Sequence, residues 1–171
     1  MAGAGSVIAA PTESYYSLQA SAPGKNIDGV VINASAGWFY INKPSTSSCG
    51  AVNPYVTVNS GGNMLFYNDG TSNQQQGYVS IVNDGTKGLF GFTKGDNGGG
   101  THFSFAGAEQ DQIKVLYDGD ANWLACPDSG AGYYIYSQKA NPNPDNKDNC
   151  IAFQMKPVPA YKNPDHVCTY N

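Results

Sequence analysis

Three stretches of the sequence repeat one pattern, and that pattern decides the fold. They are Gly29-Val-Val-Ile-Asn-Ala-Ser-Ala-Gly-Trp-Phe-Tyr-Ile-Asn-Lys43, Gly77-Tyr-Val-Ser-Ile-Val-Asn-Asp-Gly-Thr-Lys-Gly-Leu-Phe-Gly-Phe-Thr-Lys94 and Asn122-Trp-Leu-Ala-Cys-Pro-Asp-Ser-Gly-Ala-Gly-Tyr-Tyr-Ile-Tyr-Ser-Gln-Lys139. Each contains a short apolar strand, a polar turn with glycine and an aromatic-rich strand that ends near lysine, which predicts a β-hairpin. Similar units at regular spacing indicate an internal repeat.

Shorter apolar segments lie between and after these hairpins and predict further strands. A candidate first strand precedes the first hairpin, and two segments each follow the first and second hairpins, whereas one follows the third. The segments are Tyr15–Gln19, Tyr55–Val58, Met64–Gly70, Phe103–Phe105, Ile113–Gly119 and Cys150–Met155. The sequence therefore predicts twelve strands in three units. We expect the N-terminal strand to pair with the last unit and close the ring.

The composition favours an all-β fold. Gly (21), Tyr (12) and Pro (10) are abundant, which suits short strands joined by tight turns. Together with the repeat this predicts a β-trefoil-like closed barrel with three internal repeats, in which six strands close the barrel and three hairpins cap one end. Closure removes exposed strand edges. A two-sheet β-sandwich is the alternative. We expect residues 1–6 to be a leader in place of a signal peptide, and residues 7–171 to form one domain with an extended, proline-rich C-terminal tail. Because it carries Pro157, Pro159 and Pro164, we expect this tail to be irregular after Met155.

Charge and cysteine content point to an exported protein. The chain has no Arg and a net charge of −4, so we expect neither a nucleic-acid partner nor a polybasic membrane anchor, and we expect a monomer. Cys49, Cys126, Cys150 and Cys168 are scattered, which favours two disulfides in an oxidising compartment, with the pairing left open. Asn33-Ala34-Ser35 is an N-glycosylation acceptor, which we place in an exposed hairpin turn.

Catalytic and metal-binding patterns are absent from the sequence. There is no G-x-S-x-G motif, and His102 and His166 have no motif neighbours. Four Asp residues, Asp28, Asp69, Asp84 and Asp118, fall in Asn-Asp-Gly or Asp-Gly turns, where they serve turn formation rather than acid–base chemistry. We therefore expect no enzyme activity, no metal and no cofactor.

Two turns carry the residues that a sugar site uses, namely an aromatic ring beside carboxylates and amides. The first comprises Tyr67 and Asp69 and leads to Tyr78. The second comprises Tyr117, Asp118, Asp120, Asn122 and Trp123. These are the candidate ligand-binding residues, against the alternative that the large rings belong to the core. We first assign the hairpin aromatics to the core, while tyrosines on the outer half of those strands offer an adhesive surface for wall polymers.

Ile32–Ile41, Trp123-Leu-Ala-Cys-Pro127 and Cys150–Met155 occur in the order seen in the fungal PhiA-like cell-wall proteins, which the chain resembles from about Tyr15 to Met155. The strand Gly132–Tyr136 departs from that family in having Tyr where Trp is expected, and the segment Tyr161–Asn171 has no counterpart.

The resemblance implies a secreted, cell-wall-associated, allergen-like or IgE-binding protein linked to conidiation, without an established enzyme activity. It transfers Asn33, Cys126 and Cys150 as modification or disulfide candidates. We therefore expect a non-catalytic extracellular protein that binds or packs with wall polysaccharide. A β-trefoil lectin or inhibitor acting on glycans or proteins outside the cell is the alternative.

Overall fold

The computed structural model of the protein describes residues 14–68, 74–93, 102–130, 132–145, 147–160 and 167–171. These residues form twelve strands and two short 3₁₀ turns, η1 (Gln110–Gln112) and η2 (Lys147–Asn149). The strands are β1 (Tyr16–Ser21), β2 (Ile32–Ser35), β3 (Trp38–Ile41), β4 (Val56–Val58), β5 (Met64–Phe66), β6 (Gln76–Val79), β7 (Phe90–Phe92), β8 (Phe103–Ala106), β9 (Lys114–Tyr117), β10 (Asn122–Pro127), β11 (Tyr133–Ser137) and β12 (Ile151–Pro159). Nothing helical in this described part is long and apolar enough to cross a membrane.

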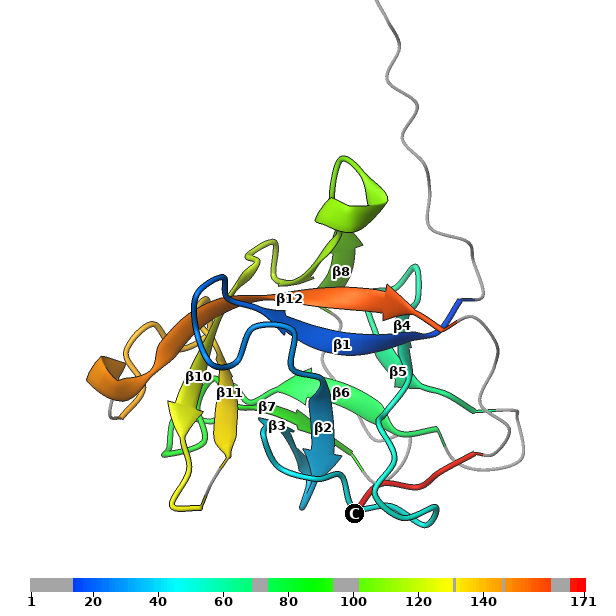
Figure 1. The fold of residues 1–171 in the computed structure, drawn as a ribbon, viewed down its shortest axis with the longest axis horizontal. Coiled ribbons are helices and arrows are strands. Elements are labelled where there is room, and N and C mark those ends of the chain that lie inside the picture. Colours follow the sequence, from blue (N-terminus) through cyan, green and yellow to red (C-terminus); the bar gives the residue numbers. More distant parts are fainter. Residues whose placement is uncertain (1–13, 69–73, 94–101, 131, 146, 161–166) are drawn as a thin grey trace, which may run out of the picture.

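Nine of the strands close into an antiparallel barrel. Neighbouring strands pair in the order β11, β10, β12, β1, β4, β5, β6, β7 and β3, and β3 then pairs with β11 to complete the ring. β1 pairs with β12 along its whole length, so the predicted contact between the N-terminal strand and the last unit is confirmed (Figure 1). The all-β closed barrel is also confirmed, and closure through β3 and β11 distinguishes it from the two-sheet sandwich.

The three predicted hairpins form and meet one another. They are β2–β3, β6–β7 and β10–β11. β3 pairs with β7 at Trp38 and Gly91 and with β11 at Tyr40 and Tyr134, while Leu89 bridges Tyr136. The hairpin β4–β5 lies within the ring, whereas the hairpin β8–β9 forms a separate two-stranded sheet. Because the paired ring includes strands of all three hairpins, it is not the simple barrel with hairpin caps that we predicted, and threefold symmetry stays a prediction.

Aromatic side chains from different strands fill the barrel. Phe39 stacks on Phe90 with ring centroids 4.0 Å apart, and Phe90 lies 5.3 Å from Trp123. Successive residues along a strand alternate between interior and exterior, as in β7, where Phe90 and Phe92 point inward on either side of Gly91. The interior is therefore built from one face of each hairpin, and the opposite face is left for other contacts.

The acceptor Asn33 does not lie in a turn, so that part of our prediction is wrong. It lies within β2 opposite Tyr40, is partly buried, and its side-chain oxygen accepts a hydrogen bond from Ser45 at 3.2 Å. The turn follows at Ala36 and Gly37, whose φ angles of 52° and 83° are both positive. That combination makes the two-residue turn that joins twisted antiparallel strands.

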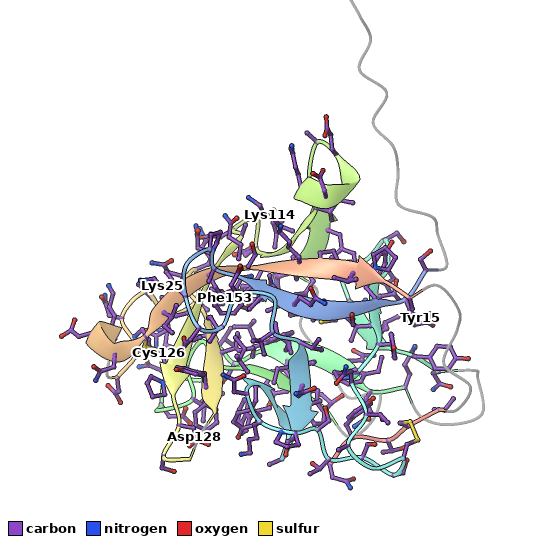
Figure 2. All side chains as sticks on the ribbon, viewed as in Figure 1. Tyr15, Lys25, Lys114, Cys126, Asp128 and Phe153 are labelled. Carbon is purple, nitrogen blue, oxygen red and sulfur yellow. A yellow bond between two sulfur atoms is a disulfide. The ribbon has the colours of Figure 1, made fainter. Side chains whose placement is uncertain are left out.

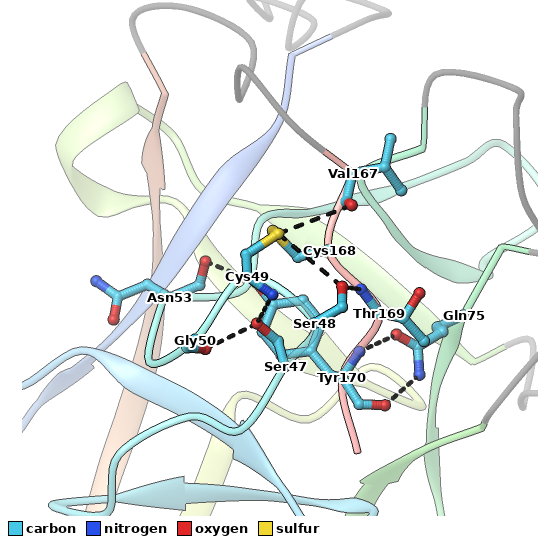
Figure 3. The surroundings of a disulfide bond; sticks show 10 residues. All are labelled: Ser47, Ser48, Cys49, Gly50, Asn53, Gln75, Val167, Cys168, Thr169 and Tyr170. Atoms are coloured by element: carbon cyan, nitrogen blue, oxygen red, sulfur yellow. Dashed lines mark hydrogen bonds between the residues drawn. A yellow bond between two sulfur atoms is a disulfide. The ribbon is translucent and has the colours of Figure 1, made fainter.

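The two disulfides form as Cys49–Cys168 and Cys126–Cys150. Cys168 holds the C-terminal segment against the body, where Gln75 accepts a hydrogen bond from Tyr170 N and donates one to Tyr170 O (Figure 3). Both of these hydrogen bonds are made by main-chain atoms of Tyr170, and the Tyr170 phenol donates a third to the Asn53 carbonyl. The final residues are therefore an integral part of the fold.

The expectation that the chain becomes irregular after Met155 is wrong. β12 continues to Pro159 and pairs with β1, with Pro157 opposite Leu18. β10 pairs with β12 only as far as Gln154. A proline lacks an N–H and is tolerated in a strand where no ladder bond is required on one side, so the strand extends through both prolines.

Candidate functional site

Two of the predicted sugar-stacking rings lie in the core. Trp123 is 0% exposed and its indole N–H donates to the Val115 carbonyl at 3.0 Å. Tyr117 is 6% exposed and lies edge-on to Phe103, with burial raising the pKa of its phenol. A ring that stacks on a sugar needs a face open to solvent. The assignment of both rings to a binding surface is therefore wrong, and they stabilise the barrel instead.

The polar members of the same turn remain at the surface. Asp120 accepts hydrogen bonds from the main-chain and side-chain nitrogens of Asn122 at 2.8 and 2.7 Å. Asp118 has a positive φ of 51°, and its carboxylate lies 3.6 Å from His102 Nδ1. Since Asp120 is engaged within the turn and the neighbouring rings point inward, the second predicted site lacks the stacking surface that we expected.

The first predicted site is also divided. Asp69 lies outside the described residues. Tyr67 follows the end of β5 and lies edge-on to Tyr15, with ring centroids 4.9 Å apart. Tyr78 lies on β6 next to Gly77, which pairs with Met64 at the start of β5. The register therefore places Tyr67 and Tyr78 near opposite ends of β5, where they do not share one site.

Tyr78 has a different aromatic partner, Trp38. Both residues are opposite Gly91 of the intervening strand, one from β3 and the other from β6. Their rings are partly exposed, with centroids 6.0 Å apart and planes inclined by 56°. Partial burial raises the pKa of the Tyr78 phenol. We call Trp38, Gly91 and Tyr78 the aromatic platform.

Gly91 is what allows the indole to lie against the sheet. A Cβ atom at this position would meet Trp38 Cε3 at 2.7 Å and Cζ3 at 2.8 Å. Real Cβ atoms do not approach other carbons so closely, since favourable carbon–carbon separations are about 3.5–4.0 Å. The bare backbone of Gly91 thus leaves room for the Cε3 and Cζ3 atoms of the Trp38 ring to lie close to β7. The platform is a prearranged aromatic surface rather than a flexible side chain.

A second cluster, of Tyr40, Lys43, Asp128 and Tyr134, lies beside the platform strand β3. Tyr40 and Tyr134 have ring centroids 4.9 Å apart, and Lys43 Nζ lies 3.9 Å from the Tyr40 ring centroid and 3.7 Å from Asp128. Tyr134 donates a hydrogen bond to Tyr40, which raises the pKa of Tyr134 to about 12. Because these groups contact one another, we assign them to holding β3 and β11 together.

The sequence signal for Trp38 was present but incomplete. Strand alternation places Trp38 and Tyr40 on one face of β3 and Phe39 and Ile41 on the other. Which face is the interior depends on barrel closure, and the pairing of Trp38 with Gly91 joins segments of different hairpins. A glycine between two bulky aromatics in β7 was the local cue to a ring lying across that strand.

Among the described residues, metal ligands and acid–base groups are not gathered at the aromatic platform. Among them, no group of three or more His, Cys, Asp or Glu side chains is placed to hold a metal ion. The platform strands β3, β6 and β7 carry no carboxylate or imidazole. The chemistry that this surface offers is aromatic contact and hydrogen bonding.

Comparison with known proteins gives one match. The model of a family described as PhiA-like secreted protein matches residues 16–171, which is nearly the whole chain. No curated protein and no solved structure matches.

Proposed function

Because this chain belongs to the PhiA-like secreted protein family, we propose that it acts outside a fungal cell as a non-catalytic protein of the cell wall that binds wall polysaccharide. Membership of a secreted family and two disulfides make it an extracellular protein. The binding role goes beyond the family match and is supported by the surface chemistry of the barrel.

The observation that carries the proposal is the aromatic platform. The axial C–H groups of a pyranose ring form an apolar face, which stacks on an aromatic ring whose face is open to solvent. Trp38 is held against Gly91 and Tyr78 lies 6.0 Å away at an inclination of 56°. Two adjacent rings that the sheet holds in place lose little side-chain entropy when a sugar binds. More of the stacking energy therefore contributes to the affinity.

The absence of carboxylates from β3, β6 and β7 favours binding over hydrolysis. Hydrolysis of a glycosidic bond by the usual route requires two carboxyl groups on either side of the bond, about 5–10 Å apart. Gln76 lies on the same face of β6 as Tyr78, so its amide could reach hydroxyl groups of a sugar bound there. We therefore propose that the polysaccharide leaves the protein unchanged.

We also propose that the barrel is organised as three repeats. The support is that each predicted hairpin contributes one strand to a mutual contact, in which β3 pairs with β7 and β11, and Leu89 bridges Tyr136. In such an arrangement the platform joins the first two repeats. Binding would then depend on the assembled barrel and not on a single hairpin.

Co-sedimentation with insoluble chitin and insoluble β-glucan tests the proposed function. Trp38→Ala and Tyr78→Ala should each weaken retention about tenfold, since an aromatic contact contributes about 1 kcal/mol or more. Tyr67→Ala is the matched control, because Tyr67 is also partly exposed and packs against another ring. Thermal melting verifies that each variant is folded.

The proposal is refuted if folded Trp38→Ala and Tyr78→Ala are retained like the wild type on every polysaccharide that binds it. Failure of the wild type to bind any wall polysaccharide refutes it as well. Release of new reducing ends by the repurified protein would contradict the non-catalytic part alone.

A further inference from the structure

An open groove lies on the outer face of the barrel wall formed by β1 and β12. It encloses about 530 Å³ between β12 and the hairpin β8–β9, together with the η1 turn. This hairpin extends from the barrel beyond β12 (Figure 2), and Lys114 lies opposite Ala106 at the end of the hairpin next to the η1 turn. A volume of this size is typical of small-molecule sites, which run from about 300 to 1,000 Å³.

The outward faces of β9 and β12 form the walls. Val115 of β9 and Met155 of β12 are fully buried in the core. By strand alternation their neighbours, Lys114 in β9 and Gln154 and Lys156 in β12, point the opposite way, and all three line the groove. Small side chains at Ala106, Ala108 and Ala121 leave the space between the walls unfilled.

One glycine fixes the shape of the rim. A Cβ at Gly107 would lie 2.6 Å from both the carbonyl carbon and the carbonyl oxygen of Gln112. These are main-chain atoms, so a side chain at residue 107 could be accommodated only if the segment moved. The close approach of Gly107 to Gln112 holds the η1 turn, and with it Asp111, against the end of the groove.

The polar groups of the groove have unused hydrogen-bonding capacity. In the described part of the chain, the side chains of Ser21, Gln112 and Gln154 form no hydrogen bond with protein groups, and no carboxylate pairs with Lys114 or Lys156. Ammonium and amide groups without partners in the protein are available to a ligand. The hydroxyl and the two amides can both donate and accept, which is what sugar hydroxyls require.

The groove is locally positive in an acidic protein. Lys114 and Lys156 line it with a single carboxylate, Asp111, whereas the chain as a whole has a net charge of −4. Two unpaired ammonium groups in one hollow repel each other and attract an anion. The surrounding negative charge discourages nonspecific anion binding elsewhere on the surface.

We propose that this groove binds a saccharide that carries a carboxylate, such as a uronic acid residue of an acidic polysaccharide. Lys114 and Lys156 contact the carboxylate, and Ser21, Gln112 and Gln154 contact hydroxyl groups. A free inorganic anion would use the lysines but not the hydroxyl-directed groups. The groove shares no residue with Trp38, Gly91 or Tyr78, so this inference does not rest on the aromatic platform.

Isothermal titration of the full-length, disulfide-bonded protein with a short oligogalacturonate tests the proposal. Its methyl ester has the same length and hydroxyl groups but no charge, and should bind roughly tenfold more weakly. Lys114→Gln and Lys156→Gln should each weaken oligogalacturonate binding by a similar factor. Lys139→Gln is the matched control because Lys139 is exposed and lies outside the groove, so its affinity should stay within about twofold of the wild type.

Three results overturn the proposal: equal affinity for the acid and the ester, no loss of affinity in either groove variant, or inorganic phosphate binding as tightly as the saccharide. Equally tight binding of phosphate would mean that the groove is a simple anion site. Trp38→Ala should leave oligogalacturonate affinity unchanged; loss of that affinity would place the acid on the platform and refute the groove. Normal oligogalacturonate binding together with failed chitin and β-glucan binding would refute the proposed function while supporting the groove.

Discussion

Replacing Gly91 with alanine tests whether the Trp38 indole depends on the bare backbone beneath it. The new methyl group would lie 2.7 and 2.8 Å from two atoms of the ring and 2.9 Å from the Gly37 carbonyl oxygen. Since carbon atoms favour separations of about 3.5–4.0 Å, the ring must withdraw by about 1 Å. The Gly37 carbonyl also accepts a hydrogen bond from Phe92 N at 3.0 Å, so the turn is strained as well.

The expected loss of stability follows from two opposing effects. Overpacking of this kind costs about 1–3 kcal/mol. Alanine also lowers the conformational entropy of the unfolded chain, which offsets about 0.4–1 kcal/mol of this loss of stability. We therefore expect Gly91→Ala to lower the free energy of unfolding by about 1–2 kcal/mol, measured by urea denaturation. Retention on wall polysaccharide should also fall, because the displaced indole no longer keeps its position beside Tyr78.

Two further variants make the result specific. Gly85→Ala is the matched control, because a Cβ there meets no atom within 4 Å, so its stability should match or slightly exceed that of the wild type. In a Trp38→Ala background, Gly91→Ala should cost less, since two of its three closest contacts have been removed. Equal costs with and without the indole, or a Gly91→Ala protein that is as stable as the wild type, would refute the argument.

Other predictions concern the termini, pH and the first hairpin. Replacing both Cys49 and Cys168 with serine opens a loop of 119 residues and should cost about 4–5 kcal/mol by chain entropy, seen as a lower urea midpoint; a loss below about 1 kcal/mol would contradict the entropic account. The pKa of Tyr134 is about 12 against an ordinary 10.0, so its contribution to stability is complete below pH 10 and declines as pH rises toward 12. Tyr134→Phe should lose less stability than the wild type across that interval. In the folded wild type, part of the tyrosinate absorbance should appear only near pH 12 rather than near pH 10. Ala36→Asn should raise stability by about 0.5–1 kcal/mol in thermal melts, because Asn tolerates the positive φ of 52° better than Ala; a lower melting temperature would count against this.

Much of the strand pattern could be predicted because it is local. Alternating residues and glycine-containing turns identified the three hairpins and the segments between them. Two errors have physical causes. Ala36 gives no turn signal although its φ is positive, so we placed Asn33 in the turn. Pro157 and Pro159 argued against a strand, but β12 needs no partner beyond Gln154 on its β10 side.

The binding surface was less predictable because it depends on which strand face becomes the interior. Trp123 and Tyr117 stand beside turn carboxylates in sequence, yet both rings enter the core. Trp38 appeared to be a core residue, yet it lies against Gly91 of another hairpin at the surface. Such pairings between distant segments follow from barrel closure, which no local pattern specifies.

Tryptophan fluorescence during a titration with soluble wall oligosaccharide tests the central claim most directly. The protein has two tryptophans, of which Trp123 is 0% exposed and Trp38 is partly exposed. If a sugar stacks on the platform, water leaves the Trp38 ring, and wild-type emission should shift saturably to shorter wavelength, whereas Trp38→Phe should show no shift. An unchanged wild-type spectrum under conditions where the oligosaccharide is bound, or the same shift in Trp38→Phe, would contradict the account.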